Sequence, residues 1–352
     1  MTVWAAAPER GSAAWLGIMR TLVARLGTPV GRAILPGIVL WFYVTSPAAR
    51  AASREYLGRV LGRAVRPRDV WRHFDAFACS IFDRALLLMG RIGSDALDVR
   101  GLPHIEAALA HGRGCLLFGA HLGGFEALRL LGRQAPARVR PLMYRRNAGA
   151  MTALLDCLDP AALADVIELG RTTAMLEAGE AVARGEILGV LADRGATDGA
   201  DRRWVMAPFL GAPAPFPVGP FALAHALGCP VLLFCAVRTR AGWTIVFEPF
   251  ADRLVLRRGA DRAADLSRYA GLYAAALDRA CRAHPFQWFN FYPFWKAPTD
   301  APPDAVAAFA HKPGPGRDAG RTGPDGAAGG GAGTQGAISG RKADRGADYA
   351  AD

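Results

Sequence analysis

The sequence predicts an α/β fold with a largely parallel sheet and flanking helices, preceded by a helical, membrane-binding N-terminal region. Three observations lead to this prediction. From about residue 97, short apolar runs alternate with stretches of helical periodicity, as in buried strands joined by helices. Residues 13–49 instead combine helical spacing with a long uncharged run. After about residue 312 the chain is mostly Gly, Ala, Asp and Arg, a composition that cannot bury a core.

These changes in pattern divide the 352 residues into three parts. We expect a helical, basic, membrane-associating region over residues 1–92, an α/β domain over 93–311 and a disordered Gly/Ala-rich tail over 312–352. Residues 1–72 hold eleven arginines and three acidic residues, so most of the net charge of +11 lies there. That charge suits anionic lipid head groups or an acidic partner protein. It would also suit nucleic acid, but no nucleic-acid-binding motif is visible, so we expect no such partner.

The N-terminal region begins with a predicted helix over residues 13–26, followed by an uncharged run over 33–49. A full membrane span needs about 20 apolar residues, and Pro36 and Pro47 shorten the usable helix further. These facts favour an interfacial or re-entrant anchor over a spanning helix, and a core helix of a soluble domain is the alternative. Aromatic residues in a row at 41–43, beside flanking arginines, favour membrane contact. Two more helices are predicted near 47–62 and 68–90.

The α/β part contains short apolar runs that predict strands and amphipathic stretches that predict helices between them. The strands are expected at 97–100, 114–120, 138–144, 165–169, 186–193, 230–238 and 243–250, and the helices at 103–111, 124–133, 148–157, 172–184, 218–228 and 261–283.

A candidate catalytic site follows the strand at 114–120, where His121 comes directly after the apolar run. Gly123 and Gly124 permit a tight turn before a helix that carries Glu126. Strand ends of open α/β sheets are where sites collect. In the spacing His-x-x-x-x-Glu, a neutral imidazole can take a proton from an alcohol while a carboxylate fixes its tautomer. A histidine that only caps backbone groups is the alternative, but the glycine pair and the nearby carboxylate favour catalysis.

Other chemistries lack their motifs. The sequence has no G-x-S-x-G nucleophile motif, and the stretch GAHLGG lacks the Lys and Ser/Thr of a P-loop. The six cysteines form no C-x-x-C pair, and the other histidines show no metal-ligand spacing with one another. We therefore expect no metal and no cofactor, and we interpret most of the other histidines as surface or hydrogen-bonded core residues.

Several stretches in this order resemble the bacterial lipid A biosynthesis acyltransferases, which are lauroyl and myristoyl transferases. The resemblance covers roughly residues 15–296. The stretches that carry it are LPGIVLWFYVTSPAARAASREYL, FGAHLGGFEALR, LMYRRN, GVLADR, APFLGAPAPFPVGPFALAHALGCPV and the closing QWFNFY. The His-x-x-x-x-acid motif is shared with glycerolipid acyltransferases and is moderately specific, whereas its order together with the FLG…FP-GP block is strongly specific.

The resemblance implies roles for particular residues. His121 would be the general base on the acceptor hydroxyl and Glu126 its partner. Arg145 would bind a phosphate or stabilise the oxyanion, with a solvated strand end as the alternative. Asp193 and Arg194 fall at a second substrate-site motif, although lipid A enzymes usually have another residue after this Asp. Substrate-lining roles, with ordinary packing as the alternative, are implied for Phe209, Gly211, Phe216, Pro217 and Gly219.

The resemblance also implies the reaction, in which a fatty acyl group passes from an acyl carrier protein thioester, or from acyl-CoA, to a hydroxyl of a lipid acceptor. That acceptor would be a lipid A precursor or another specialised lipid, and the enzyme would lie on the cytoplasmic face of the inner membrane. Three alternatives stay open: a glycerolipid acyltransferase, a thioesterase or hydrolase that uses the same His/Glu pair on water, and a non-catalytic membrane accessory protein.

Overall fold

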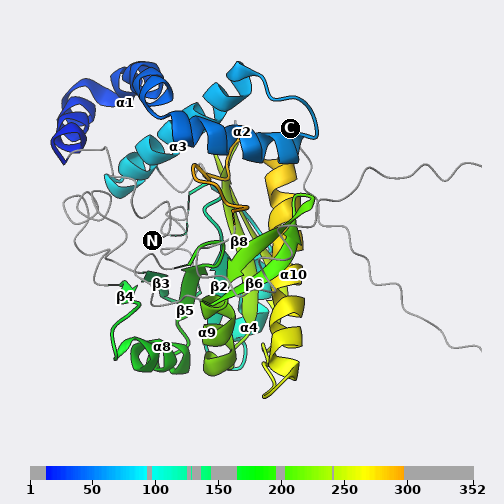
Figure 1. Cartoon of the computed structure of the whole chain (residues 1–352). Helices are drawn as coiled ribbons and strands as arrows, with labels where there is room; N and C mark the ends of the chain where they lie inside the picture. The colour runs from blue at the N-terminus through cyan, green and yellow to red at the C-terminus, as the bar shows by residue number, and fades with distance from the viewer. Residues whose placement is uncertain are drawn as a thin grey trace, which may run out of the picture.

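A seven-stranded sheet forms the centre of the molecule (Figure 1). In the computed structural model, the described residues are 13–92, 97–124, 128, 136–143, 165–195, 203–239 and 242–296. The strand order is β1-β9-β8-β2-β5-β3-β4, and every pair is parallel except β8 with β9. This confirms the largely parallel sheet and all seven predicted strands. Their bounds are β1 Leu97–Arg100, β2 Cys115–Gly119, β3 Val139–Met143, β4 Ile167–Glu168, β5 Ile187–Leu191, β8 Val231–Arg238 and β9 Trp243–Ala251.

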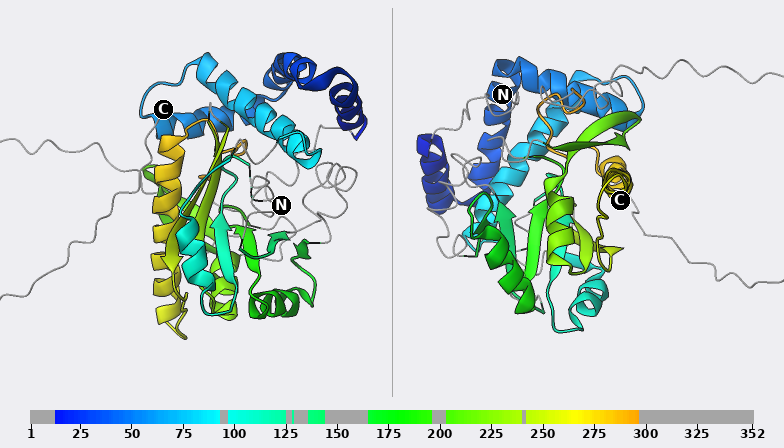
Figure 2. Two further views of the ribbon diagram at one scale, coloured as in Figure 1. Left: turned by 180° about the vertical axis from the view of Figure 1, so that it is seen from behind. Right: turned by 60° about the horizontal axis from the view of Figure 1, so that its bottom comes forward.

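Helices cover both faces of this sheet (Figures 1 and 2). Ile105 of α4 (Leu102–Leu109) packs on one face, with Leu117 of β2. On the other face Leu116 of β2 shares a core with α8 (Ala174–Ala183), α9 (Gly219–Leu227) and α10 (Asp261–Ala283). These four helices lie close to their predicted ranges. The helix predicted at 148–157 and the tail at 312–352 lie outside the described residues, as does the helix predicted at 124–133 except for the helical Leu128.

A hairpin of β6 (Trp204–Phe209) and β7 (Ala212–Pro217) was not predicted from the sequence. Four prolines in these two strands make the segment resemble a loop, because a proline cannot donate to a strand ladder. A two-stranded sheet tolerates them, since each strand has an edge that needs no donor. Leu210 and Gly211 form the turn with φ of 48° and 80°, a conformation that glycine adopts easily.

The N-terminal region consists of α1 (Ala13–Thr45), α2 (Pro47–Leu61) and α3 (Pro67–Leu88). The expectation that Pro36 shortens the helix of the uncharged run is wrong, because α1 runs through both Pro29 and Pro36, whereas Pro47 lies beyond its end and begins α2. A proline removes one backbone hydrogen bond and bends the helix, while the turns on either side remain helical. The ribbon shows α1 as a bent helix (Figure 1). Tyr56 of α2 and Phe74 of α3 belong to the same hydrophobic cluster as the strand residue Phe118. The N-terminal helices and the sheet therefore share one core.

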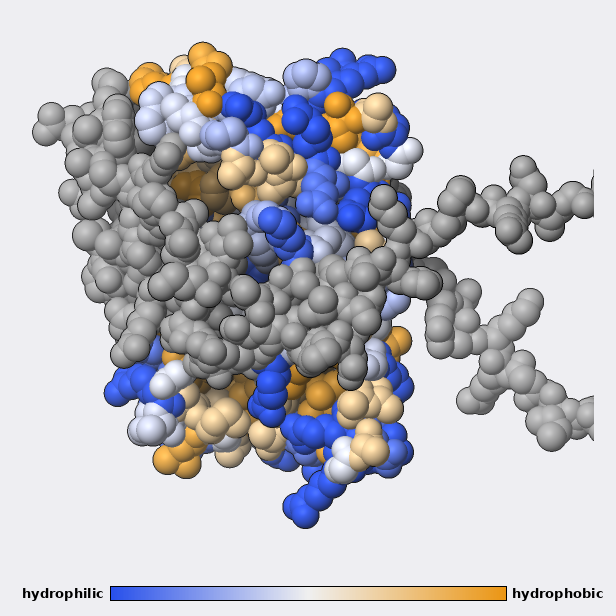
Figure 3. Space-filling model, viewed as in Figure 1, coloured by the Kyte–Doolittle hydropathy of each residue, from blue (hydrophilic) through white to orange (hydrophobic). Residues whose placement is uncertain are grey.

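One side of α1 is apolar and exposed. Leu35 and Val39 face the protein interior and are only 5% and 2% exposed, whereas Leu40 and Trp41 are each 53% exposed and Val44 is 60% exposed. The surface view shows hydrophobic side chains gathered over this part of α1 (Figure 3). Within the described residues, one helical stretch, Thr28–Thr45, is long and apolar enough to cross a membrane, and 17% of it is buried.

Candidate active site

The loop that carries His121 leaves the end of β2 and is pressed against β8. Gly123 has φ of 70°, and a Cβ atom there would lie 1.8 Å from the carbonyl oxygen of Ala236. A Cβ atom on Gly124 would lie 2.6 Å from the ring of Trp243. The two glycines are therefore required for the turn and for its close approach to the neighbouring strands. Their N–H groups donate to the carbonyls of Gln287 and Ala236, at 2.8 and 2.9 Å.

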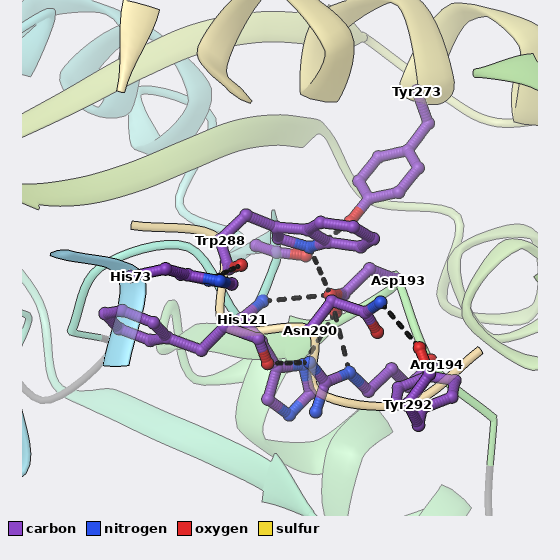
Figure 4. A network of polar contacts seen from close by, with 10 residues as sticks. His73, His121, Asp193, Arg194, Tyr273, Trp288, Asn290 and Tyr292 are labelled. Atoms are coloured by element: carbon purple, nitrogen blue, oxygen red, sulfur yellow. Dashed lines mark hydrogen bonds and ion pairs between the residues drawn. The ribbon is translucent and has the colours of Figure 1, made fainter. Parts of the chain in front are cut away.

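His121 lies beside Asp193, which follows β5 just as His121 follows β2. The two strands are parallel neighbours, so their carboxyl ends meet at one edge of the sheet. His121 Nδ1 lies 2.8 Å from Asp193 Oδ1, and the His121 backbone N–H donates to Asp193 Oδ2 at 3.1 Å (Figure 4). An ionised carboxylate only accepts hydrogen bonds, so Nδ1 carries the proton and Nε2 is the basic nitrogen of the ring. This is the tautomer that a general base needs.

Asp193 is fully buried, whereas the His121 side chain is 36% exposed. Burial alone raises the pKa of the Asp193 carboxyl. The interactions with His121 and the charge of Arg194 outweigh this effect and hold that pKa below its ordinary value. A third donor, Trp288 Nε1–H, reaches Asp193 Oδ2 at 3.0 Å. A buried aspartate thus stays ionised behind a histidine that solvent or a substrate can reach, which is an arrangement suited to removing a proton from an alcohol.

Residues 287–292 (QWFNFY) pack against this pair. The Phe289 N–H donates to the His121 carbonyl at 2.9 Å, and Leu122 forms an antiparallel bridge with Trp288. Arg194 donates to the Phe289 carbonyl, and its guanidinium lies 5.1 Å from the centre of the Tyr292 ring. The described contacts of Arg194 are therefore with this segment and with Asp193, 3.9 Å away.

His73 of α3 supports the same segment from behind. It is fully buried, and Nε2 lies 2.9 Å from the Trp288 carbonyl while Nδ1 lies 2.8 Å from Ser53 Oγ. Burial lowers the pKa of His73 to about 4. It is a hydrogen-bonded core histidine, as expected for most of the histidines other than His121.

The structure brings some of the predicted site residues together and leaves two undescribed. His121, Asp193 and Arg194 form one cluster (Figure 4). Glu126 and Arg145 lie outside the described residues. The other predicted residues belong to the hairpin and to α9. Phe209 and Phe216 are fully buried, Gly211 lies in the hairpin turn, Pro217 ends β7 and Gly219 begins α9.

Sequence reasoning missed the contact between His121 and Asp193 and the part played by Trp288. The signal for Asp193 was its place after a buried strand, which is also the place of His121. The only signal for Trp288 was the aromatic stretch QWFNFY, because no local pattern shows what a buried indole N–H contacts.

The comparison with known proteins gives one family match, which covers the site residues described above. A family model described as bacterial lipid A biosynthesis acyltransferase matches residues 7–297, which include His121, Asp193 and Trp288. No curated protein matches the chain.

Proposed function

The chain belongs to the bacterial lipid A biosynthesis acyltransferase family, and from this premise we propose how it transfers an acyl group. The family makes the protein an acyltransferase, with a lipid acceptor and an acyl donor. The observation that carries the mechanism is the 2.8 Å contact between His121 Nδ1 and Asp193 Oδ1, at the ends of adjacent parallel strands.

In the proposed reaction, His121 Nε2 takes the proton of the acceptor hydroxyl. The hydroxyl oxygen attacks the thioester carbonyl carbon, the carbon–sulfur bond breaks, and the departing thiolate receives the proton from the imidazolium. Asp193 keeps Nδ1 protonated and stabilises the positive charge on the ring. Glu126 remains a predicted partner of His121, and Arg145 a predicted ligand for a phosphate or for the oxyanion.

We assign the predicted substrate-lining residues more specifically. The Phe209 ring lies 5.3 Å from that of Trp288, and Phe216 packs 5.8 Å from Phe209. Phe209 therefore supports Trp288 directly, and Phe216 supports Phe209. Gly211 and Gly219 fit ordinary roles in a turn and at a helix start, while Arg194 orders the segment 287–292 beside the substrate.

The donor is proposed to be an acyl carrier protein, because such proteins are acidic and residues 1–72 carry a large excess of arginine. Acyl-CoA is the alternative donor. The acceptor is proposed to be a lipid A precursor or another specialised lipid. The arginine after Asp193 departs from the usual pattern of lipid A enzymes. This departure keeps another specialised lipid open as the acceptor.

Membrane attachment is proposed to use the exposed side of α1 with Leu40, Trp41 and Val44, supported by the surrounding arginines. Because Leu35 and Val39 of the same helix are buried against the protein, the helix suits an interfacial or re-entrant position. The site would then face the cytoplasmic leaflet of the inner membrane, where acyl carrier protein is present.

The deciding experiment incubates the full chain in detergent with a carrier protein that bears a labelled acyl group, with and without a lipid extract. A labelled lipid supports acyl transfer and identifies the acceptor, including a glycerolipid. Labelled free fatty acid as the sole product would make the protein a thioesterase that uses His121 on water. Absence of turnover with both acyl carrier protein and acyl-CoA would favour a non-catalytic accessory role.

A further inference from the structure

We propose that Trp288 is a positioning residue for the His121–Asp193 pair, and that His73 of α3 fixes Trp288 in place. This inference rests on the proposed function, since it assigns Trp288 an effect on the proposed base. An NMR titration that does not depend on activity tests this inference separately from the proposed function.

Within the described part of the chain, three hydrogen bonds hold the Asp193 carboxylate. His121 makes two of them and Trp288 makes the third. Oδ1 faces His121 Nδ1, while Oδ2 accepts the His121 backbone N–H and the Trp288 Nε1–H. Trp288 and Asp193 are both fully buried, so water does not replace the indole N–H if it is lost. The orientation of the carboxylate, and through it that of the His121 ring, therefore depends on Trp288 (Figure 4).

The Trp288 ring is held in turn by aromatic side chains from other elements. Tyr56 of α2 lies 4.9 Å away at 65°, Phe209 of β6 lies 5.3 Å away at 77° and Phe294 lies 5.0 Å away at 85°. These edge-to-face arrangements fix the plane of the indole and thus the direction of its N–H.

The Trp288 backbone is held by His73. A carbonyl only accepts hydrogen bonds, so His73 Nε2 carries the proton that is donated to the Trp288 carbonyl. His73 Nδ1 then accepts the hydroxyl proton of Ser53 at 2.8 Å. Trp288 thereby connects the N-terminal helices α2 and α3 to the His121–Asp193 pair.

Trp288 also contributes to the electrostatics of the site, because the positive end of its N–H dipole points at Asp193. Among the described residues, the other titratable groups that interact with Asp193 are Arg194, at 3.9 Å, and Tyr273, Cys281 and Tyr292, whose pKa values burial raises. Those three are neutral near pH 7. Arg194 keeps its charge whether or not the indole is present, so removing the indole N–H makes the potential at the His121 ring more negative. The imidazolium form is then favoured, and the His121 pKa rises.

The test compares Trp288→Phe with Trp295→Phe. Trp295 is a matched control, since it is buried in the same aromatic cluster and its Nε1 donates to the Phe209 carbonyl at 3.3 Å. Both substitutions remove a buried indole and one hydrogen bond, but only Trp288 contacts Asp193. If Trp288→Phe fails to fold, benzothienylalanine at position 288 removes the N–H while keeping the bicyclic shape.

The measurements are the His121 titration, by NMR of ¹³C-labelled histidine assigned with His121→Gln, and the kinetics of acyl transfer. For Trp288→Phe we expect the His121 pKa to rise by about 0.5 unit or more. We also expect kcat to fall about tenfold with KM unchanged, less than the roughly 10²–10⁴-fold loss expected without the base. Trp295→Phe should change the melting temperature but neither of these quantities.

An unchanged or lowered His121 pKa in Trp288→Phe, or an equal shift in Trp295→Phe, would overturn the proposal. Full activity of His121→Gln would instead refute the proposed function. The NMR titration would still decide whether Trp288 acts on His121.

Discussion

Asp193 Oδ1 lies 2.8 Å from His121 Nδ1, although 72 positions separate the two residues in the chain. They meet because β2 and β5 are adjacent and parallel, with Gly119 paired to Leu191 just before the two side chains. The contact selects one tautomer of His121 and gives its conjugate acid a buried counter-charge.

Asp193→Asn should reduce kcat by at most the roughly 10²–10⁴-fold expected for loss of His121 itself, because an amide cannot balance the imidazolium and permits the wrong tautomer. Initial rates of acyl transfer measure this. Asp265→Asn is the control, since Asp265 is also a buried carboxylate but pairs with Arg257, at 2.9 Å. The control should lose stability and keep its kcat. Similar losses of kcat in both variants would mean that Asp193 acts only through stability.

His121→Ala should reduce transfer by about 10²–10⁴-fold while the fold is retained, because the residue lies in a partly exposed loop. Glu126→Ala is expected to keep more activity, since an orienting carboxylate does not itself move the proton. Circular dichroism checks the fold and rate assays give the ranking. Near-normal turnover of His121→Ala would exclude it as the base.

Replacing both Leu40 and Trp41 by glutamate should abolish liposome binding. Each side chain is 53% exposed on α1, and a buried apolar side chain contributes about 1.5–3 kcal/mol. Leu272→Glu is the matched control, because Leu272 is 50% exposed but lies on α10. Co-sedimentation with anionic vesicles at low and high salt measures the apolar and the electrostatic contributions to binding. The contribution of the arginines should fall with salt. Equal binding by both variants and the wild type would place the membrane contact elsewhere.

Acidification should destabilise the protein through His73. Burial lowers the pKa of His73 to about 4 from an ordinary value of 6.5, so between these pH values the unfolded chain binds a proton that the folded protein refuses. Stability is therefore fully present above pH 6.5 and is lost as the pH falls towards 4, by roughly 3 kcal/mol.

Denaturant unfolding at several pH values tests this. His73→Gln should be less stable at pH 7 but should lose less between pH 6.5 and 4, while His104→Gln, at an exposed position, should follow the wild type. His284, whose pKa is also lowered by burial, leaves a residual slope. An unchanged slope in His73→Gln would contradict the assignment.

Arg145→Lys separates two jobs for the predicted arginine, because lysine keeps the charge and loses the planar fork. Phosphate binding predicts a higher KM for the acceptor at nearly constant kcat. Oxyanion stabilisation predicts that kcat and kcat/KM fall together, by about 2.7–4 kcal/mol in free energy. Arg146→Lys is the control, since the strand alternation predicted from the sequence would point the neighbouring side chain the other way. Equal effects, or none, would leave the pair as a solvated strand end.

The sheet was predictable because each strand is a short apolar run, and buried parallel strands need little else to be recognised. The hairpin of β6 and β7 was missed because Pro208, Pro213 and Pro215 hide its strands, and the continuity of α1 because Pro36 is a strong local signal against a helix. In both cases the surrounding structure tolerates a residue that local propensity disfavours.

The site was predictable only in part for a related reason. His121 stood out because a histidine, two glycines and an acid follow a strand within six positions. Its contact with Asp193 depends on which strands become neighbours, and the strand order β8-β2-β5 cannot be read from the runs themselves. The role of Trp288 depends on a return of the chain across the sheet after α10, which no local spacing encodes.

The shared core of the N-terminal helices and the sheet limits how the protein can be cut. Proteolysis before Ser46 removes α1, and with it Leu35 of the small cluster with Phe82 and Leu86 and Val39 at the edge of the main core. Cleavage between α2 and α3 instead separates Tyr56 and Leu57 from the main core, to which both belong. The protein should therefore unfold in a single cooperative transition that includes α2 and α3. A shortened version made for crystallisation must start no later than Ser46.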